Sequence, residues 1–334
     1  MGKSSRKKDS VNMVLVGNPN VGLTTLFNQL TGGILHKSPV DAKEGTVKGH
    51  DYTNVIELPG LYSLSAYSAD DISTREILLS GIPDVIVNVV DATSIERSLY
   101  LTLQLMELEV PMVLALNMMD EVEHNQIDID LRQLEEELTI PVIPISASKN
   151  QGIHDLVHYA LEAARNKTIP RKLDFCSGHV HNAIHAVIHM VESHACAAGL
   201  PLRFSATRLV EGDSQIQEAL KLSEADLDII HHIVDDMEFH MNTDREAAVA
   251  DMRYEYIEEL SARVIHRPQL STVEQERSYK IDRILTHKYL AIPIFIAIMG
   301  LVFYFTFNSI GAWLKCKIDR KSTRLNSSHF VPSR

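Results

Sequence analysis

Residues 17–25 read GNPNVGLTT, and this stretch decides the fold because it matches a phosphate-binding loop at all but one position. The apolar, β-branched run before it, residues 11–16, predicts a buried strand. Residues 24–30 predict a helix directly after it. In such an arrangement, backbone N–H groups and the helix N-terminus face phosphate groups. The chain is therefore expected to have an α/β fold that binds a phosphorylated ligand.

The exception in the loop is Leu23, which stands where the pattern G-x-x-x-x-G-K-[ST] has a lysine. Gly17, Gly22 and Thr24 fit the pattern, and a threonine hydroxyl at that place suits Mg²⁺. The usual lysine adds positive charge at the β- and γ-phosphates, which leucine cannot supply. Taken alone, the loop leaves open a second interpretation, a glycine-rich turn that binds nothing.

Two further apolar runs, residues 85–90 and 112–116, predict buried strands. The second run ends directly at NMMD, which begins at Asn117 and ends at Asp120. A carboxylate at Asp120 can accept hydrogen bonds from the ring N1–H and the exocyclic amine of guanine, while Asn117 braces the loop. Strand ends at one edge of an open α/β sheet are where ligands bind.

A fourth strand, predicted at residues 142–145, ends at the sequence SASK. The N–H of Ala147 in this sequence can donate to the guanine O6. Each short motif is weak alone, but the order of phosphate loop, NMMD and SAS indicates a GTP-binding domain.

With these motifs in place, the chain resembles the cytosolic part of the bacterial ferrous-iron transporter family (FeoB). The resemblance covers roughly residues 11–314 and implies a Ras-like P-loop GTPase domain, an all-α helical domain that steadies nucleotide binding, and a membrane part that moves Fe²⁺. It also implies GTP/GDP and Mg²⁺ as ligands and GTP hydrolysis as the reaction. The expected location is the bacterial inner membrane, with the soluble domains on the cytoplasmic side, and a homo-oligomer is possible. The segments that carry it are GNPNVGLTTLFNQLTG, ELPGLYSL, residues 88–120 and MRYEYIEEL with Arg253, Tyr254 and Ile257.

The nucleotide-binding residues expected from the motifs and the resemblance come from four segments, and no catalytic residue is assigned. Thr24 is expected to bind Mg²⁺ directly and Glu57 through water. The full set is Gly17, Asn18, Pro19, Asn20, Val21, Gly22, Leu23, Thr24, Thr25, Glu57, Leu58, Pro59, Gly60, Asn117, Met118, Asp120, Ser146, Ala147 and Ser148.

Three departures from the family pattern concern phosphate and metal. Leu23 replaces the loop lysine. Glu57 replaces the aspartate of the family's D-x-P-G, and its side chain is one methylene longer than aspartate. Residues 33–43 are shorter than the family's first switch and lack its G-V-T stretch, for which Ser38 is a poor substitute. Both base-reading motifs are intact, so guanine selectivity is expected to outlast catalysis, with weakened GTP affinity and slow or absent hydrolysis.

Residues 289–314 carry no formally charged side chain and exceed the ~20 residues that a helix needs to cross a bilayer. Tyr289 and Trp313 suit the membrane interfaces. A buried core helix is the alternative, which the length disfavours. One such helix cannot enclose an ion path, so this polypeptide alone is not expected to transport iron.

The expected organisation combines these segments. The net charge of -12 argues against nucleic acid as a partner, and three cysteines without a C-x-x-C pair fit a reducing cytosol. In order, we expect a disordered lead-in (1–10), a GTP-binding G domain (11–168), a helical regulatory domain (169–270), a juxtamembrane linker helix (271–288), a transmembrane helix (289–314) and a non-native tail (320–334).

Histidines are dense in the expected helical domain. His181, His185 and His189 recur every fourth residue, so a helix would place them on one face. Such a row suits a transition metal, and the alternative is a polar helix face with neutral imidazoles.

Three functions follow from these patterns. The first is the guanine-nucleotide-dependent regulatory part of a ferrous-iron transporter, in which residues 33–43 and 57–70 switch and the helical domain relays the change. The second is a non-catalytic pseudo-GTPase that serves as a binding or scaffold module. The third, a soluble translational or ribosome-assembly GTPase, is disfavoured by the apolar span and the acidic charge balance.

Overall fold

The computed structural model describes residues 10–33, 42–65, 69–171, 175, 178–266 and 291–306. The chain divides into two units, Met1–Pro268 and Gln269–Arg334, and each is described by itself. The predicted linker helix and tail lie outside the described residues, as do the lead-in apart from Ser10 and most of the shortened first switch.

A six-stranded sheet forms the centre of the first unit, in the order β2-β3-β1-β4-β5-β7. Neighbouring strands pair in parallel, except that β2 runs antiparallel to β3. The four strands predicted from apolar runs are confirmed to within a residue at each end. The strands are β1 (Val11–Gly17), β2 (Lys43–Thr46), β3 (Thr53–Glu57), β4 (Val85–Asp91), β5 (Met112–Asn117) and β7 (Val142–Pro144).

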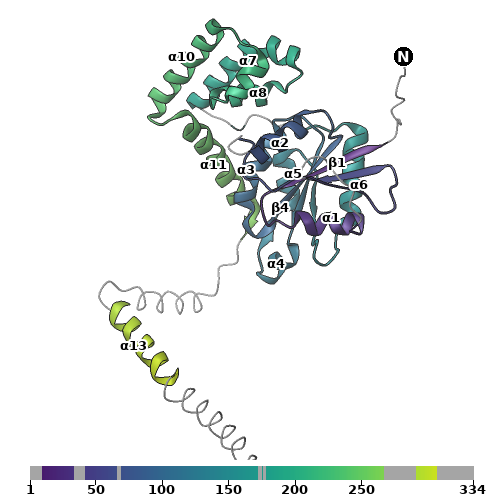
Figure 1. The fold of residues 1–334 in the computed structure, drawn as a ribbon, viewed down its shortest axis with the longest axis vertical. Coiled ribbons are helices and arrows are strands. Elements are labelled where there is room, and N and C mark those ends of the chain that lie inside the picture. Colours follow the sequence, from purple (N-terminus) through teal and green to yellow (C-terminus); the bar gives the residue numbers. More distant parts are fainter. Residues whose placement is uncertain are drawn as a thin grey trace, which may run out of the picture. The chain divides into compact units, whose positions relative to one another are not determined.

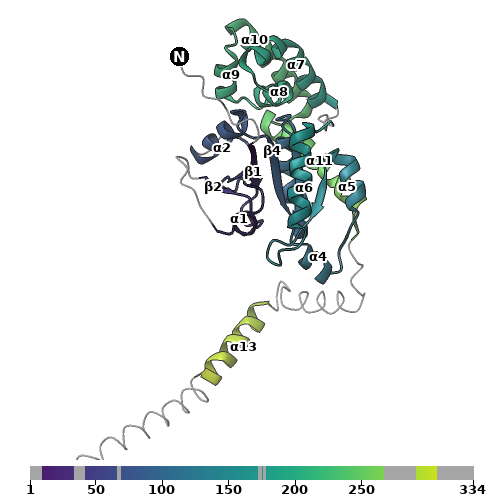
Figure 2. The ribbon, with the colours of Figure 1, turned by 90° about the vertical axis from the view of Figure 1, so that its right-hand side faces the viewer.

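Helices cover both faces of this sheet, which explains why its central strands are apolar on both sides. Met13 and Leu15 of β1 pack into a core with helices α1 (Leu23–Thr31) and α6 (Ile153–Asn166). Their neighbours Val14 and Val16 belong to a second core on the other face, together with α3 (Ile95–Met106) and α5 (Leu131–Leu138). Figure 1 and Figure 2 show these helices around the sheet, and α3 is labelled in Figure 1.

The sequence patterns of residues 98–108 and 129–138 each predict a helix, and both predicted starts were wrong. The first helix, α3, starts earlier, because Asp91 accepts a hydrogen bond from the Thr93 N–H and caps a short 3-10 turn, η1 (Ala92–Ser94), that leads into it. In the second, Ile129 lies in a short strand, since Asp130 caps α5 by accepting from Gln133 N. The remaining helices here are α2 (Ala69–Leu79) and α4 (Met119–His124).

Residues 178–264 are helical throughout apart from short turns, as the sequence predicted. The sequence from Ser223 to Asp226 predicts a helix start, and in the structure these two residues form a reciprocal capping box at the start of α10. The five helices are α7 (Gly178–Ala198), α8 (Leu202–Val210), α9 (Ser214–Leu220), α10 (Glu224–Met241) and α11 (Arg245–Val264).

Helix α11 joins the helical part to the sheet domain. It packs against α10 and α7 at one end and against α3 and α5 at the other, and Figure 1 shows it running between the two parts. It leads into the strand β8 (Ile265–His266), which pairs antiparallel with β6 (Asp128–Ile129). The chain therefore returns to the sheet domain at its last described strand in this unit.

The second unit contributes one described helix, α13 (Ala291–Tyr304), whose side chains are almost all apolar. It is the described part of the predicted membrane span, and the predicted interfacial residues Tyr289 and Trp313 lie outside the described residues. Within the described ranges, none of the helices combines the length and the apolar character needed to cross a membrane.

Candidate functional site

The phosphate-type loop lies between the end of β1 at Gly17 and the start of α1 at Leu23. Gly22 adopts a φ of 92°, in the left-handed region that favours glycine. A Cβ at this position would lie 2.4 Å from Nδ2 of Asn117. The loop therefore needs glycine here both for its backbone conformation and for the close approach of Asn117.

The segment ELPG packs directly against this loop. The N–H of Leu61 donates to the carbonyl of Gly17 at 3.1 Å, and a Cβ on Gly60 would come within 2.9 Å of the Cα of Pro19. Loop and segment enclose a cavity of about 460 Å³. Its lining residues are Pro19, Asn20, Gly22, Leu23, Thr24, Thr25, Lys43, Glu57, Leu58, Pro59 and Gly60.

Leu23 is buried, with 7% of its surface exposed, and its side chain belongs to the core shared with α1 and α6. Burying a leucine side chain, relative to leaving it exposed, stabilises the fold by about 1.5–3 kcal/mol. The leucine is thus well accommodated in the fold, but it brings no charge to the cavity.

A cation nevertheless lies in this cavity, and it comes from β2. Nζ of Lys43 donates to Oγ1 of Thr24 at 3.0 Å and to Oε1 of Glu57 at 2.9 Å. The Thr24 hydroxyl in turn donates to the same Glu57 oxygen at 2.5 Å. Lys43 and Glu57 face each other because the β2–β3 pairing places their Cα atoms in register. The three side chains form one closed group.

This arrangement does not fit the Mg²⁺ ion expected at Thr24 and Glu57. Magnesium takes oxygen ligands in octahedral geometry, and the ion expected here would bind Thr24 directly and Glu57 through water. The Thr24–Glu57 hydrogen bond does not itself exclude that arrangement. The obstacle is the Lys43 ammonium, which is hydrogen-bonded to both side chains and would have to be displaced by a divalent ion.

At the other end of the site, Asn117 connects three segments. Its Nδ2 donates to the carbonyl of Val21 in the loop at 2.8 Å, and its Oδ1 accepts from the N–H of Ala147 at 2.9 Å. The residue is 3% exposed, so both hydrogen bonds are buried. Asn117 thus braces the loop. The Ala147 N–H, expected to face the guanine O6, donates to Asn117 in this structure.

Asp120 is the second residue of α4, whose N-cap residue Met118 has a φ of 65°. Its Oδ2 is 3.2 Å from Nζ of Lys149. The pKa of Asp120 is lowered, chiefly because the Ser146 side chain hydrogen-bonds to it, with a smaller contribution from Lys149. The carboxylate therefore stays ionised near neutral pH and can accept hydrogen bonds.

The structure places the predicted site residues in two groups. Those of the loop and the ELPG segment surround the cavity, apart from Gly17, Asn18 and Val21, which lie in the loop without lining it. The NMMD and SAS residues come together at the neighbouring ends of β5 and β7. Lys43 was missed by the sequence reasoning, although the turn around Gly49 is a signal for the hairpin that positions it.

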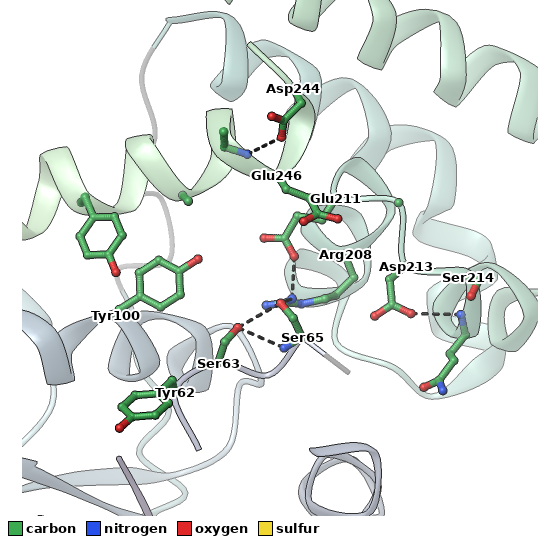
Figure 3. A pocket seen from close by; sticks show the side chains of 15 residues that line it. Tyr62, Ser63, Ser65, Tyr100, Arg208, Glu211, Asp213, Ser214, Asp244 and Glu246 are labelled. Carbon is green, nitrogen blue, oxygen red and sulfur yellow. Dashed lines mark hydrogen bonds and ion pairs between the residues drawn. The ribbon is translucent and has the colours of Figure 1, made fainter. Parts of the chain in front are cut away.

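A larger cavity, of about 680 Å³, lies between the segment after Gly60 and the helical domain. Figure 3 shows Arg208 of α8 directed toward Ser65, to whose Oγ its Nη1 donates at 2.9 Å. The same guanidinium pairs with Glu211 at 2.6 Å. Arg75 of α2 pairs with Asp213 at the start of α9. The first contact ties the predicted second switch to the helical domain, and the second ties the following helix α2 to it.

A buried ion network lies beside this cavity. Arg253 of α11 is fully buried and lies 2.8 Å from Glu211 and 3.4 Å from Glu107, which follows α3. Burial raises the pKa of Glu107, although Arg253 and Arg208 act in the opposite direction. Burial acts the same way on Glu211, but Arg208 and Arg253 leave its pKa lowered. Removing one member would leave a buried charge without its partner.

The histidine row occupies one face of α7, as its spacing predicted. The rings of His181 and His185 lie 4.2 Å apart between centroids. Among the residues that the structure describes, no group of three histidine, cysteine or acidic side chains is arranged to hold a metal ion. The row therefore gives no support to a transition-metal site.

Comparison with known proteins identifies both parts of the first unit. A family model described as ferrous iron transport protein B matches residues 11–160, and a second, the FeoB cytosolic helical domain, matches residues 177–266. The Fe(2+) transporter FeoB of Salmonella typhimurium is 33% identical over 331 residues, covering 89% of this chain and 39% of the relative. The Fe(2+) transport protein A/Fe(2+) transporter FeoB fusion protein of Porphyromonas gingivalis is 33% identical over 315 residues, covering 89% and 37%.

Solved structures agree with the fold. A GDP-bound variant of S. thermophilus NFeoB superposes with a TM-score of 0.71 at 33% identity, covering 77% of this chain and 100% of that chain. The mGMPPNP-bound NFeoB from S. thermophilus gives 0.67 at 33% identity, covering 76% and 97%. The chain thus spans well under half the length of the curated relatives but all, or nearly all, of these solved chains.

Proposed function

We propose a function from one premise: the chain belongs to the ferrous iron transport protein B (FeoB) family, with that family's Ras-like G domain and helical domain. It binds guanine nucleotide as the regulatory part of a ferrous iron transporter. The observation that carries this proposal is Asn117, which holds the loop through Val21 and the SAS sequence through Ala147. Solved relatives carry GDP or mGMPPNP.

Hydrolysis of GTP is weak in this chain. Leu23 directs an apolar side chain into the core, so the loop contributes no cation to the transition state. Thr24 and Glu57 are hydrogen-bonded to each other. The same observations favour the second candidate, a pseudo-GTPase that binds nucleotide and signals occupancy without turnover.

The nucleotide state reaches the helical domain through the segment after Gly60. Ser65 lies at the described end of that segment and accepts a hydrogen bond from Arg208. Leu64 donates its N–H to Gln104 of α3 at 2.6 Å, so the segment is also held by the sheet domain. A displacement of the segment on nucleotide exchange must break or move these contacts, which gives the helical domain a direct mechanical input.

Transport of Fe²⁺ belongs to the longer family members, of which this chain spans 37–39%. Residues 289–314 would form the first membrane helix and place the soluble domains on the cytoplasmic face of the inner membrane. The apolar composition of the described part, α13, supports this placement.

The test is a comparison of the chain with its Leu23→Lys variant. We expect the chain to bind GDP in preference to ADP and to release phosphate from GTP slowly. Leu23→Lys should raise turnover by about tenfold or more, because it returns a cation to the loop. Leu23→Met, which keeps the volume and adds no charge, is the matched control. Turnover in the unaltered chain as fast as in Leu23→Lys, with no excess of Leu23→Lys over Leu23→Met, would refute the effect of Leu23 on hydrolysis. Calorimetry without heat on adding GDP would refute the proposed function.

A further inference from the structure

The phosphate cavity keeps a positive charge although its loop has lost the lysine. Lys43 is the cation among the described residues that line the cavity, and it enters from β2 rather than from α1. Its side chain is 42% exposed, so the ammonium lies at the mouth of the cavity, open to a ligand from solvent. Glu57 beneath it is 6% exposed.

Three donor hydrogens determine what this ammonium can do. A lysine ammonium has three N–H donors and no acceptor. Two of them are engaged by Thr24 and Glu57 at 3.0 and 2.9 Å. The third is left for an oxygen in the cavity, and charge-assisted hydrogen bonds of this kind are the strong ones for phosphate.

Charge balance gives Lys43 a second role. Glu57 is a largely buried carboxylate in a cavity whose expected ligand carries several negative charges. Without a neighbouring cation, the carboxylate and the phosphates would repel each other at close range. The salt bridge from Lys43 offsets that repulsion. In sites that bind Mg²⁺, the metal neutralises phosphate charge, but here the ammonium is hydrogen-bonded to Thr24, the expected direct ligand, and to Glu57, expected to act through water.

We infer that Lys43 supplies the positive charge that the loop lysine and Mg²⁺ supply in other phosphate-binding loops. It binds the phosphates of a guanosine diphosphate and makes that binding independent of Mg²⁺. The inference rests on the proposed function, because it concerns the same nucleotide site. Lys43 is a binding residue, supplied by the strand that pairs with the ELPG segment. It supports the bound state and does not replace the loop lysine in catalysis, since its position is set by Glu57.

The experiment measures GDP affinity by calorimetry for the full chain and its variants, in EDTA and in excess MgCl₂. For the unaltered chain, the GDP dissociation constants in the two buffers should differ by less than about threefold. Lys43→Gln should lose about tenfold or more in EDTA, the scale of one charged hydrogen bond. Part of that loss should return with MgCl₂, because removal of the ammonium frees Thr24 and Glu57 for the metal. Lys43→Arg, which keeps the charge, should retain affinity in EDTA.

The matched control is Lys48→Gln, an equal loss of charge at an exposed position of the same hairpin, expected to change affinity by less than about twofold. Two results would overturn the inference: a tenfold loss of affinity in EDTA for the unaltered chain, or a Lys43→Gln variant that binds GDP in EDTA as the unaltered chain does. The first result needs no variant, so a folding defect in Lys43→Gln would not rescue the inference. Absence of GDP binding in both buffers would instead overturn the proposed function.

Discussion

The two ends of the nucleotide site are built differently. The end proposed to read the base, called the base-reading end below, is held by neighbouring parallel strands, β5 and β7, and by buried hydrogen bonds of Asn117 to two other segments. The phosphate end combines a loop, a helix start and an antiparallel hairpin, and its charged groups sit at a partly exposed mouth. Selectivity for the base and binding of the negatively charged phosphates therefore depend on separate elements, so one property can change while the other is kept.

The largest effect is expected at the base-reading end. Asp120→Asn replaces a carboxylate that we propose accepts from both the N1–H and the amine of guanine with an amide that can accept only one of them. The loss of one charged hydrogen bond, and of the charge on the other, predicts a fall in GDP affinity of about 10²–10³-fold. Xanthosine diphosphate, which has a carbonyl where guanine has the amine, should gain affinity in the same variant. Calorimetry with both nucleotides measures the exchange.

Glu121→Gln is the control for Asp120→Asn, because it removes the same charge from the exposed neighbouring residue. It should leave GDP affinity within about twofold, as expected for an exposed charge. Unchanged GDP affinity in Asp120→Asn would mean that the nucleotide base lies elsewhere, and the distinction between the two ends would fall with it.

A smaller effect is expected at Asn117, the side chain that joins the two ends. Asn117→Ala leaves the Val21 carbonyl and the Ala147 N–H without their buried partner, at a cost of about 1–3 kcal/mol for each. Part of this cost falls on the free protein, so GDP affinity should fall by about 10–100-fold. Isothermal titration should show the loss for GDP in EDTA and in MgCl₂ alike. Asn125→Ala, at an exposed position after α4, is the control, and an equal loss in both variants would contradict the bracing role.

The base-reading end could be predicted from sequence because its parts are local. Asn117 is the last residue of β5 and Ala147 lies three residues after the last residue of β7, so finding the strands was enough to bring them together. Strand ends at one sheet edge converge without knowledge of any side-chain contact. The hydrogen bond from the Ala147 N–H to Asn117 was not predicted, because the sequence does not show that Asn117 is close enough to accept it, and the contact of this N–H with guanine stays a prediction.

The phosphate end could be predicted only in part. The glycine pattern located the loop, but the pairing of Lys43 with Glu57 depends on the register of a hairpin whose strands are short and not strongly apolar. A shift of one residue in that register would have placed Lys43 on the opposite face. The contact of Arg253 with Glu107 joins residues far apart in the chain, and no local pattern encodes it.

The smallest effect is expected from Glu57→Asp, which restores the family's residue at the phosphate end. The side chain is one methylene shorter, so its carboxylate withdraws from Lys43 and Thr24 and weakens a partly exposed salt bridge worth about 0–1 kcal/mol. GDP affinity in EDTA should fall by about threefold or less, and a modest gain on adding MgCl₂ should appear as the closed group loosens. The preference for GDP over ADP should stay as it is, because no base-reading residue contacts Glu57. Competition titrations with ADP measure that ratio in both buffers. A tenfold change in the ratio would show that the hairpin also shapes the base-reading end, and that the two ends act as one unit.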